Sequence, residues 1–283
     1  MNAASVEELV ELAATEGGHR ARVIAVASGK GGVGKTNICA NLAICLAAAG
    51  KRVALFDADF GLANLDIVLG INSKYNLSHF IRGGKSLEEI CQPACEGVDV
   101  ICGLCGLEGL ANMSDFTRER VIKSLELLSD NYDVVVVDTS AGIGKNVLAF
   151  CMAADHTVLV STTEPTSITD VYTLLKMLTT KKYDGRLSLL VNMAQNISEG
   201  KKVYRQISTA AAQFLDTRLN HAGVLVRDDH VALAVRKRQP VVLEYPRCAT
   251  TQTLMTVAAR LSRVPVNNFA GQSFFKKVVN WFF

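Results

Sequence analysis

The stretch Ser28-Gly29-Lys30-Gly31-Gly32-Val33-Gly34-Lys35-Thr36 lies between an apolar run at residues 23–27 and a long segment rich in alanine and leucine. This order predicts a strand, a glycine loop and a helix over about residues 36–49. From Gly29 to Thr36 the loop matches the phosphate-binding pattern Gly-x4-Gly-Lys-Thr. Glycines let backbone N–H groups converge on an anion, and the positive end of the helix dipole points toward it. The stretch predicts a phosphate site, because a chance glycine-rich turn would not need the flanking strand and helix.

Two side chains of the loop have defined tasks in such a site. Lys35 supplies a positive charge to the β and γ oxygens of a nucleotide, and the hydroxyl of Thr36 can bind Mg²⁺. A second lysine, Lys30, is not needed by an ordinary phosphate loop, although it could attract the anion within its own chain. The residues expected to line the phosphate site are Gly29, Lys30, Gly31, Gly32, Val33, Gly34, Lys35, Thr36 and Asn37.

The composition points to one large globular domain. The chain has 283 residues, of which 49% are hydrophobic and 20% charged, so a sizeable core is available and global disorder is excluded. The net charge of +3 does not indicate a general coat for nucleic acids, and no direct nucleic-acid partner is expected. The sequence has no apolar run of spanning length and no basic start followed by an apolar stretch, so we expect a cytoplasmic protein.

Eight cysteines are too few for a disulfide scaffold in a chain of this length. Four of them gather in one region: Cys91, Cys95, Cys102 and Cys105. The last two have the spacing of zinc or redox pairs, but the spacing of the first three matches no familiar zinc finger. We therefore expect a zinc content near zero, and metal or redox chemistry remains the alternative.

Strands and helices alternate along the chain, which predicts an α/β fold with a doubly wound, mostly parallel sheet. The later strands are expected at residues 52–56, 98–102, 133–137, 156–161, 187–192 and 222–226. The later helices are expected at about residues 117–129, 167–180, 199–215, 229–237 and 250–261. We expect an N-terminal amphipathic segment and linker at 1–20, an ATPase domain at 21–263, and a tether with a terminal helix at 264–283.

Three carboxylates follow predicted strands. Asp57 and Asp59 follow the second strand, and Asp138 follows a run of four valines. Ligands of open parallel sheets lie beyond the carboxyl ends of the strands, so these side chains should converge on the phosphate site. A buried carboxylate at the end of an apolar strand is costly without a cation, and Mg²⁺ supplies one. Helix capping or a surface turn is the alternative for each.

The loop with its two lysines resembles the deviant Walker A motif of the MinD/ParA ATPases. That resemblance implies ATP and Mg²⁺ as cofactors, hydrolysis of ATP, and a homodimer that encloses two nucleotides. It implies that Lys30 reaches the partner's phosphates and is catalytic together with Lys35. By the same resemblance Asp59 orients the attacking water, while Thr36, Asp57 and Asp138 belong to the Mg²⁺ shell.

Three more residues are assigned to the nucleotide by this resemblance. Asn192 ends a predicted strand, where its amide can read the edge of adenine, although an ordinary turn asparagine is the alternative. Asp228 belongs to a loop that departs from the family pattern, with Val226 where proline is usual. Glu164 would lie at the dimer face near the partner's nucleotide.

Within the family, residues 164–172, 192–194 and 199–200 resemble the FlhG/FleN (YlxH) flagellar-number regulators. The resemblance implies control of flagellar number or placement through the flagellar GTPase FlhF and a transcriptional activator. A MinD-type regulator of the division site and a ParA-type DNA or cargo partitioning ATPase are the alternatives. The peptide at residues 2–9 matches only loosely the N-terminal GTPase-activating peptide of such regulators.

The two ends of the chain carry amphipathic patterns. At residues 5–14 the apolar positions Val6, Leu9, Val10 and Ala13 alternate with glutamates, as in a short helix that is either a frayed tail or a docking peptide. The C-terminal helix has a basic side and an aromatic face suited to the inner membrane surface. Its expected membrane residues are Phe274, Phe275, Lys276, Lys277, Val278, Trp281 and Phe282. The alternative is packing on the protein's own surface, and the two states could alternate between monomer and ATP dimer.

Overall fold

A computed structural model describes residues 20–59, 65–81, 84–102, 126, 130–262 and 274–282 of the chain. The N-terminal segment up to residue 19, all but one residue of the helix predicted at 117–129, Cys105 and the tether at 264–272 lie outside the described residues. Among the described helices, none combines the length and the apolar character needed to cross a bilayer.

The described part of the chain forms one eight-stranded sheet in the order β3-β4-β2-β5-β1-β6-β7-β8. All neighbouring strands are parallel except β3 and β4, as the sequence predicts for a mostly parallel sheet. The strand bounds are β1 Arg22–Ser28, β2 Val53–Ala58, β3 Cys91–Cys95, β4 Val98–Ile101, β5 Val134–Ala141, β6 His156–Ser161, β7 Arg186–Ala194 and β8 Asn220–Val226. Strands β2 to β5 lie on one side of β1, and β6 to β8 lie on the other. The phosphate loop, which follows β1, therefore lies where the strand order reverses, which is where open parallel sheets bind ligands.

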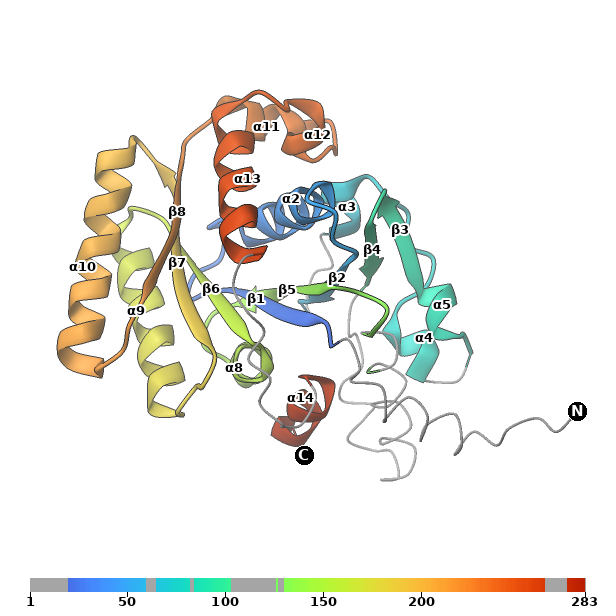
Figure 1. Cartoon of the computed structure of the whole chain (residues 1–283), viewed down its shortest axis with the longest axis horizontal. Coiled ribbons are helices and arrows are strands. Elements are labelled where there is room, and N and C mark those ends of the chain that lie inside the picture. The colour runs from blue at the N-terminus through green and yellow to red at the C-terminus, as the bar shows by residue number, and fades with distance from the viewer. Residues whose placement is uncertain are drawn as a thin grey trace, which may run out of the picture.

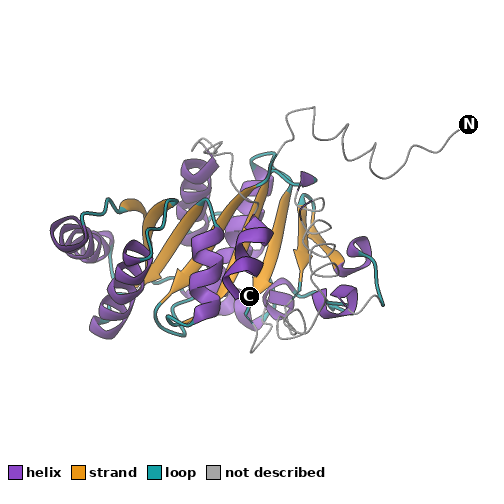
Figure 2. Cartoon of the chain, turned by 90° about the horizontal axis from the view of Figure 1, so that it is seen from below, coloured by secondary structure: helices purple, strands orange, loops and turns teal. Residues whose placement is uncertain are grey.

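Helices cover both faces of the sheet (Figure 1). One face carries α2 Lys35–Ala48, α3 Leu65–Leu69, α11 Asp229–Arg236, α12 Val241–Glu244 and α13 Ala249–Ser262. The other carries α8 Lys145–Ala153, α9 Pro165–Thr180, α10 Ile197–Leu215 and α14 Phe274–Phe282. Figure 2 shows α14, beside the C mark, in front of the strands. Two short helices, α4 Leu77–Ile81 and α5 Leu87–Ile90, lead into the edge strand β3. The valines of β5 and the alanines and valines of β1 are buried between the two layers.

Several strands are longer than predicted, and in β2, β5 and β7 this places a site residue within the strand; Asn192 lies inside β7 and does not end it. The second strand continues to Ala58 and the valine-rich strand to Ala141, so Asp57 and Asp138 lie within strands rather than after them. The edge strand β3 was not predicted. It contains Pro93, which an edge strand tolerates because its backbone nitrogen need not donate to a neighbour.

The C-terminal helix packs on the protein itself. Phe274, Phe275 and Val278 are buried, which is the alternative that the sequence left open. The ring of Phe275 meets that of Phe56 edge-on at a centroid distance of 5.8 Å, and Phe274 lies 6.3 Å from the ring of Phe150. These rings fill the space beside α8, so the face predicted to enter a membrane is covered in this conformation.

Candidate functional site

The phosphate loop joins β1 to α2 and is fixed by contacts on both sides. Gly34 caps α2 with a φ of 89°, in the left-handed region that favours glycine. Gly29 lies so close to α9 that an added Cβ would stand 2.4 Å from the backbone carbonyl of Asp170. The Ser28 hydroxyl donates to the backbone oxygen of Lys30 at 2.7 Å. The loop is thus held in shape by the protein and need not be ordered by an anion.

Lys35, the first residue of α2, is buried. Its Nζ donates to Ser28 Oγ at 2.9 Å. Burial lowers the pKa of Lys35, and the nearby carboxylates of Asp138 and Asp59 act in the opposite direction. The ammonium group of Lys35 therefore lies near negative charges. It has three N–H donors, so it can also donate to the oxygens of a phosphate.

Asp57 and Asp138 stand beside each other in register on β2 and β5. Burial raises the pKa of Asp57 to about 7. It raises the pKa of Asp138 to about 6, against the opposing effects of a hydrogen bond from Thr36 and the charge of Lys35. Two buried carboxylates on neighbouring strands repel each other when both are charged, and burial disfavours the charge of each.

The residues present fit a magnesium ion. Asp57 Oδ2 is buried and has no hydrogen-bond partner in the part of the chain that the structure describes. A divalent cation supplies what this oxygen lacks, and carboxylate and hydroxyl oxygens are the ligands that Mg²⁺ prefers. Asp57, Asp138 and the hydroxyl of Thr36 would hold the ion directly or through water. When bound, it would neutralise charge on the phosphate oxygens.

Asp59 follows β2 directly, and its backbone nitrogen donates to Asp57 Oδ1 at 2.9 Å. This bond places the start of the loop next to Asp57. It also leaves the other oxygen of Asp57 for the cation. The residues that continue this loop, 60–64, lie outside the described part.

Lys30 makes its contacts within its own chain. Its Nζ donates to Glu164 Oε2 at 2.7 Å and to Thr166 Oγ1 at 2.9 Å. The hydrogen bond from Lys30 and its positive charge lower the pKa of Glu164. These contacts within the chain were not predicted: the resemblance assigned Lys30 to the partner's phosphates and Glu164 to the dimer face, and Thr166 was not singled out.

Asn192 lies beside the loop, where its Nδ2 donates to the backbone oxygen of Val33 at 2.8 Å. Asp228 caps α11 and accepts hydrogen bonds from the backbone nitrogens of His230 and Thr250 at 3.0 and 3.2 Å. Burial would raise the pKa of Asp228, but bonds from these two residues lower it to about 2. Asp228 thus ties α11 to α13.

The sequence also missed two side chains that support the charged centre. Ser28 connects the loop backbone to Lys35, and its only signal was its place at the end of the first strand. Cys39, on α2, was not singled out, yet its Sγ donates to Asp138 Oδ1 at 3.4 Å. Burial raises the pKa of Cys39 well above its usual range, so it acts as a neutral donor.

The cysteine cluster does not converge on one point in the described region. Cys91 and Cys95 lie on β3, and Cys102 is 2.8 Å from the hydroxyl of Ser73. Among the described residues, no three histidine, cysteine or acidic side chains are grouped to hold a metal ion.

Comparison with known proteins gives a family model described as an AAA domain, which matches residues 21–189. The antiactivator FleN of Pseudomonas aeruginosa is 39% identical over 248 residues, which cover 88% of this chain and 89% of that protein. The flagellum site-determining protein YlxH of Helicobacter pylori is 33% identical over 276 residues, 92% of this chain and 90% of that protein. The structure of the cell division ATPase MinD of Pyrococcus furiosus superposes with a TM-score of 0.69 at 21% identity, covering 86% of this chain and 99% of that one, so this likeness concerns the fold.

Proposed function

We propose that the chain, which belongs to the MinD/ParA-type ATPases in the branch of FleN and YlxH, is a switch that controls flagellar number or placement. The switch is driven by hydrolysis of ATP to ADP and phosphate. FleN is named an antiactivator and YlxH a flagellum site-determining protein, and both match almost the whole chain. The MinD relatives match at lower identity, 30% for that of Synechocystis, which favours the flagellar function over the division site.

The observation that carries the switch is the position of Lys30. A lysine used only to hold phosphate would stay near its own loop, whereas Lys30 extends to Glu164 and Thr166 at the N-terminus of α9. Its side chain is 38% exposed and that of Glu164 is 65% exposed, so the pair lies at the surface beside the nucleotide site. We propose that a second subunit with ATP docks on this surface, and that Lys30 then exchanges Glu164 for the partner's phosphates.

Dimerisation would also set the state of the C-terminal helix. In the described conformation its aromatic face is buried against α8 and β2. We propose that this is the docked state and that the ATP dimer releases the helix to the inner membrane. One short helix binds lipid weakly, whereas two helices on one dimer gain from effective concentration.

The partners proposed for the switch are an FlhF-type GTPase and the transcriptional activator that an antiactivator opposes. Their support is the similarity to FleN and YlxH. A salt-sensitive, ATP-dependent shift of DNA without lipid binding would instead favour a ParA-type function.

Lys30→Ala tests the switch. We expect this variant to keep a good part of its ATP affinity, because Lys35 and the loop backbone remain, but to lose ATP-dependent dimerisation in light scattering and most ATP hydrolysis. Lys145→Ala, which removes a lysine at the start of α8, is the matched control and should behave like the wild type. Dimerisation of Lys30→Ala with ATP at wild-type concentrations would overturn the cross-subunit role.

The biological output needs its own test. Deletion of the gene should change the number or position of flagella seen by electron microscopy, and a plasmid copy should restore both. Unchanged flagella would exclude the flagellar function while leaving the ATPase intact. Removal of residues 273–283 should abolish ATP-dependent sedimentation with anionic liposomes but preserve hydrolysis in solution, and retained sedimentation would exclude the membrane role.

A further inference from the structure

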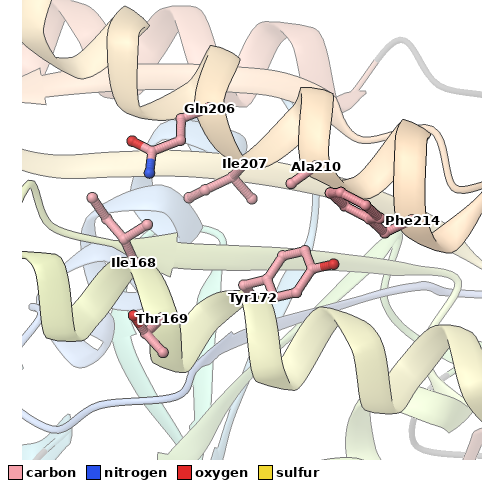
Figure 3. Close-up of a pocket in the computed structure, with 7 residues that line it drawn as sticks. All are labelled: Ile168, Thr169, Tyr172, Gln206, Ile207, Ala210 and Phe214. Carbon is pink, nitrogen blue, oxygen red and sulfur yellow. The ribbon is translucent and has the colours of Figure 1, made fainter.

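A groove runs between α9 and α10. Figure 3 shows side chains of the two helices facing each other across it. Its volume is about 290 Å³. The groove is lined by Ile168, Thr169, Tyr172, Gln206, Ile207, Ala210 and Phe214.

The groove is apolar and ends on an exposed aromatic ring. Phe214 is 68% exposed, the largest exposure of any large hydrophobic side chain in the described region. Ile207 forms the buried floor of the groove. An open apolar groove rimmed by polar groups is the surface on which an amphipathic helix packs.

Lysines stand at both ends of the groove. Lys176 follows Tyr172 by one turn of α9, and Lys202 precedes Gln206 by one turn of α10. Both are exposed, and neither forms an ion pair with the other residues that the structure describes. The two helices contain few acidic residues: the backbone and Cβ of Asp170 lie against Gly29, and Glu199 accepts from the backbone nitrogen of Gln195 at 2.6 Å. The groove therefore favours a negatively charged occupant.

The chain itself contains a segment with the complementary pattern. Residues 5–14 place Val6, Leu9, Val10 and Ala13 on one side of a helix, and the glutamates at 7, 8 and 11 outside that side. Residues 1–16 contain four glutamates and no lysine or arginine. An apolar stripe flanked by negative charge matches an apolar groove flanked by positive charge.

The attachment point of this segment is within reach of the groove. Arg20 pairs with Asp155 at 3.1 Å, just before β6. The same end of the sheet holds the end of α9, since Tyr183 donates to the backbone oxygen of Ala154 at 3.0 Å. The end of α10 is also there, because the hydroxyls of Thr179 and Thr217 are 3.1 Å apart. Phe214 thus lies on the last turn of α10 nearest to this attachment.

The length of the linker agrees with this placement. Residues 15–19 can span roughly 17 Å when extended. The strands β1 and β7 are separated by β6, hence by roughly 10 Å, and the helix layer lies about another 10 Å out. A direct path of roughly 14 Å follows, which the linker can cover.

We propose that residues 5–14 dock as a helix in the groove between α9 and α10 of the same chain. The apolar side covers Tyr172 and Phe214, and the glutamates lie beside Lys176 and Lys202. The segment then acts as a built-in cover for a docking surface, which a partner carrying an acidic amphipathic helix would have to displace.

The test uses full-length protein and a fluorescent synthetic peptide of residues 2–16. In the wild-type chain the tethered segment is present at an effective concentration near millimolar, so the peptide should bind weakly. Leu9→Asp in the chain should empty the groove and raise the affinity for the wild-type peptide at least about 10-fold, measured by fluorescence anisotropy. Leu12→Asp is the matched control, because Leu12 lies off the apolar side and its substitution should leave the binding weak.

Further variants locate the binding site. In the Leu9→Asp chain, Phe214→Ala or Lys202→Glu should remove the gained binding, whereas Leu233→Ala on α11 should not. ATP hydrolysis should stay unchanged in all of these variants. Equal peptide binding by the wild-type and Leu9→Asp chains, or binding that survives Phe214→Ala, would overturn the proposal. Docking of residues 5–14 on a second copy of the chain, seen as self-association of the wild-type protein that increases with its concentration, would overturn it as well.

Discussion

Buried polar groups differ in their hydrogen bonding between the two ends of the parallel strands. At the carboxyl end, Asp57 and Asp138 lie side by side on β2 and β5, and one oxygen of Asp57 has no partner among the described residues. At the amino end, the buried guanidinium of Arg22 donates to the backbone oxygen of Leu261 and to His156 Nδ1. His156 Nε2 in turn lies 2.8 Å from the hydroxyl of Ser188.

This difference separates function from stability. Hydrogen-bonded buried groups at the amino end contribute to a unique fold, and removing one leaves its partners unsatisfied. Buried charges without full partners at the carboxyl end are unfavourable until a ligand supplies the missing interactions. Substitutions at the carboxyl end should therefore weaken ligand binding and hydrolysis, and those at the amino end should weaken the fold.

Lys35→Ala should have the largest effect and should act on binding alone. We expect Lys35 to contact the β and γ oxygens, so the loss of its charge should weaken ATP binding by at least about 1,000-fold, roughly 4 kcal/mol. Titration calorimetry with ATP and Mg²⁺ measures this loss, and urea unfolding without nucleotide checks that the fold persists. A variant that binds ATP within tenfold of the wild type would show that the carboxyl end does not depend on this charge.

Arg22→Met should have the largest effect at the amino end. It leaves the oxygen of Leu261 and Nδ1 of His156 without a donor, so the free energy of unfolding should fall by about 3 kcal/mol. Arg52→Met is the control, because Arg52 is 59% exposed and its ion pair with Asp133 should contribute less than about 1 kcal/mol. ATP affinity at 25 °C should not change in either variant, and equal stability losses would remove the contrast between buried and exposed arginines.

Local patterns were sufficient to predict the sheet and the phosphate loop. Runs such as the four valines of β5 indicate a buried strand wherever they occur, and the loop needs only neighbouring residues. The edge strand β3 could not be predicted in this way, because its Pro93 and polar residues do not distinguish a strand from a loop. Strand ends were also missed, since Asp57 and Asp138 look like loop residues until their burial is known.

Contacts between residues that are distant in the chain could not be predicted from the sequence. The pattern that places Phe275 on an apolar face is the same for a membrane and for the ring of Phe56, and only the packed structure distinguishes them. In the site, Thr166 and Cys39 gain their roles from the approach of Lys30 and Asp138, which lie far away in the chain. The hydrogen bond between Lys30 and Glu164 was not predicted either, because no local pattern joins the two residues.

A pair of aspartates offers a direct comparison of the two ends. Asp57→Asn removes a buried charge and, without Mg²⁺, should raise the free energy of unfolding by about 1 kcal/mol while abolishing Mg²⁺-dependent hydrolysis. Asp155→Asn at the amino end should lower it by about 2 kcal/mol, because Asp155 accepts from the nitrogen of Val23 at 2.9 Å and from Arg20. Urea unfolding in EDTA measures both, and changes of the same sign would contradict the division between the ends.

The smallest effect concerns pH and the amino end. Burial, with the charges of Arg22 and Arg186, lowers the pKa of His156 to about 3. The neutral ring accepts from Arg22 at Nδ1, so its proton stays on Nε2, where it can donate to Ser188. Below about pH 6.5, the pKa of His156 in the unfolded chain, the ring is protonated in the unfolded state but stays neutral in the folded state.

The stability supplied by neutral His156 is therefore complete above pH 6.5 and is lost as the pH falls toward the folded pKa of about 3. The gap in unfolding free energy between the wild type and His156→Gln should narrow by about 1 kcal/mol from pH 6.5 to pH 5.5, because the unfolded histidine is already half protonated at pH 6.5. Ser188→Ala removes the same hydrogen bond without a titrating group, so its gap from the wild type should stay constant over this range. Urea unfolding at each pH distinguishes the two, and parallel curves for His156→Gln and the wild type would show that the ring is protonated inside the fold.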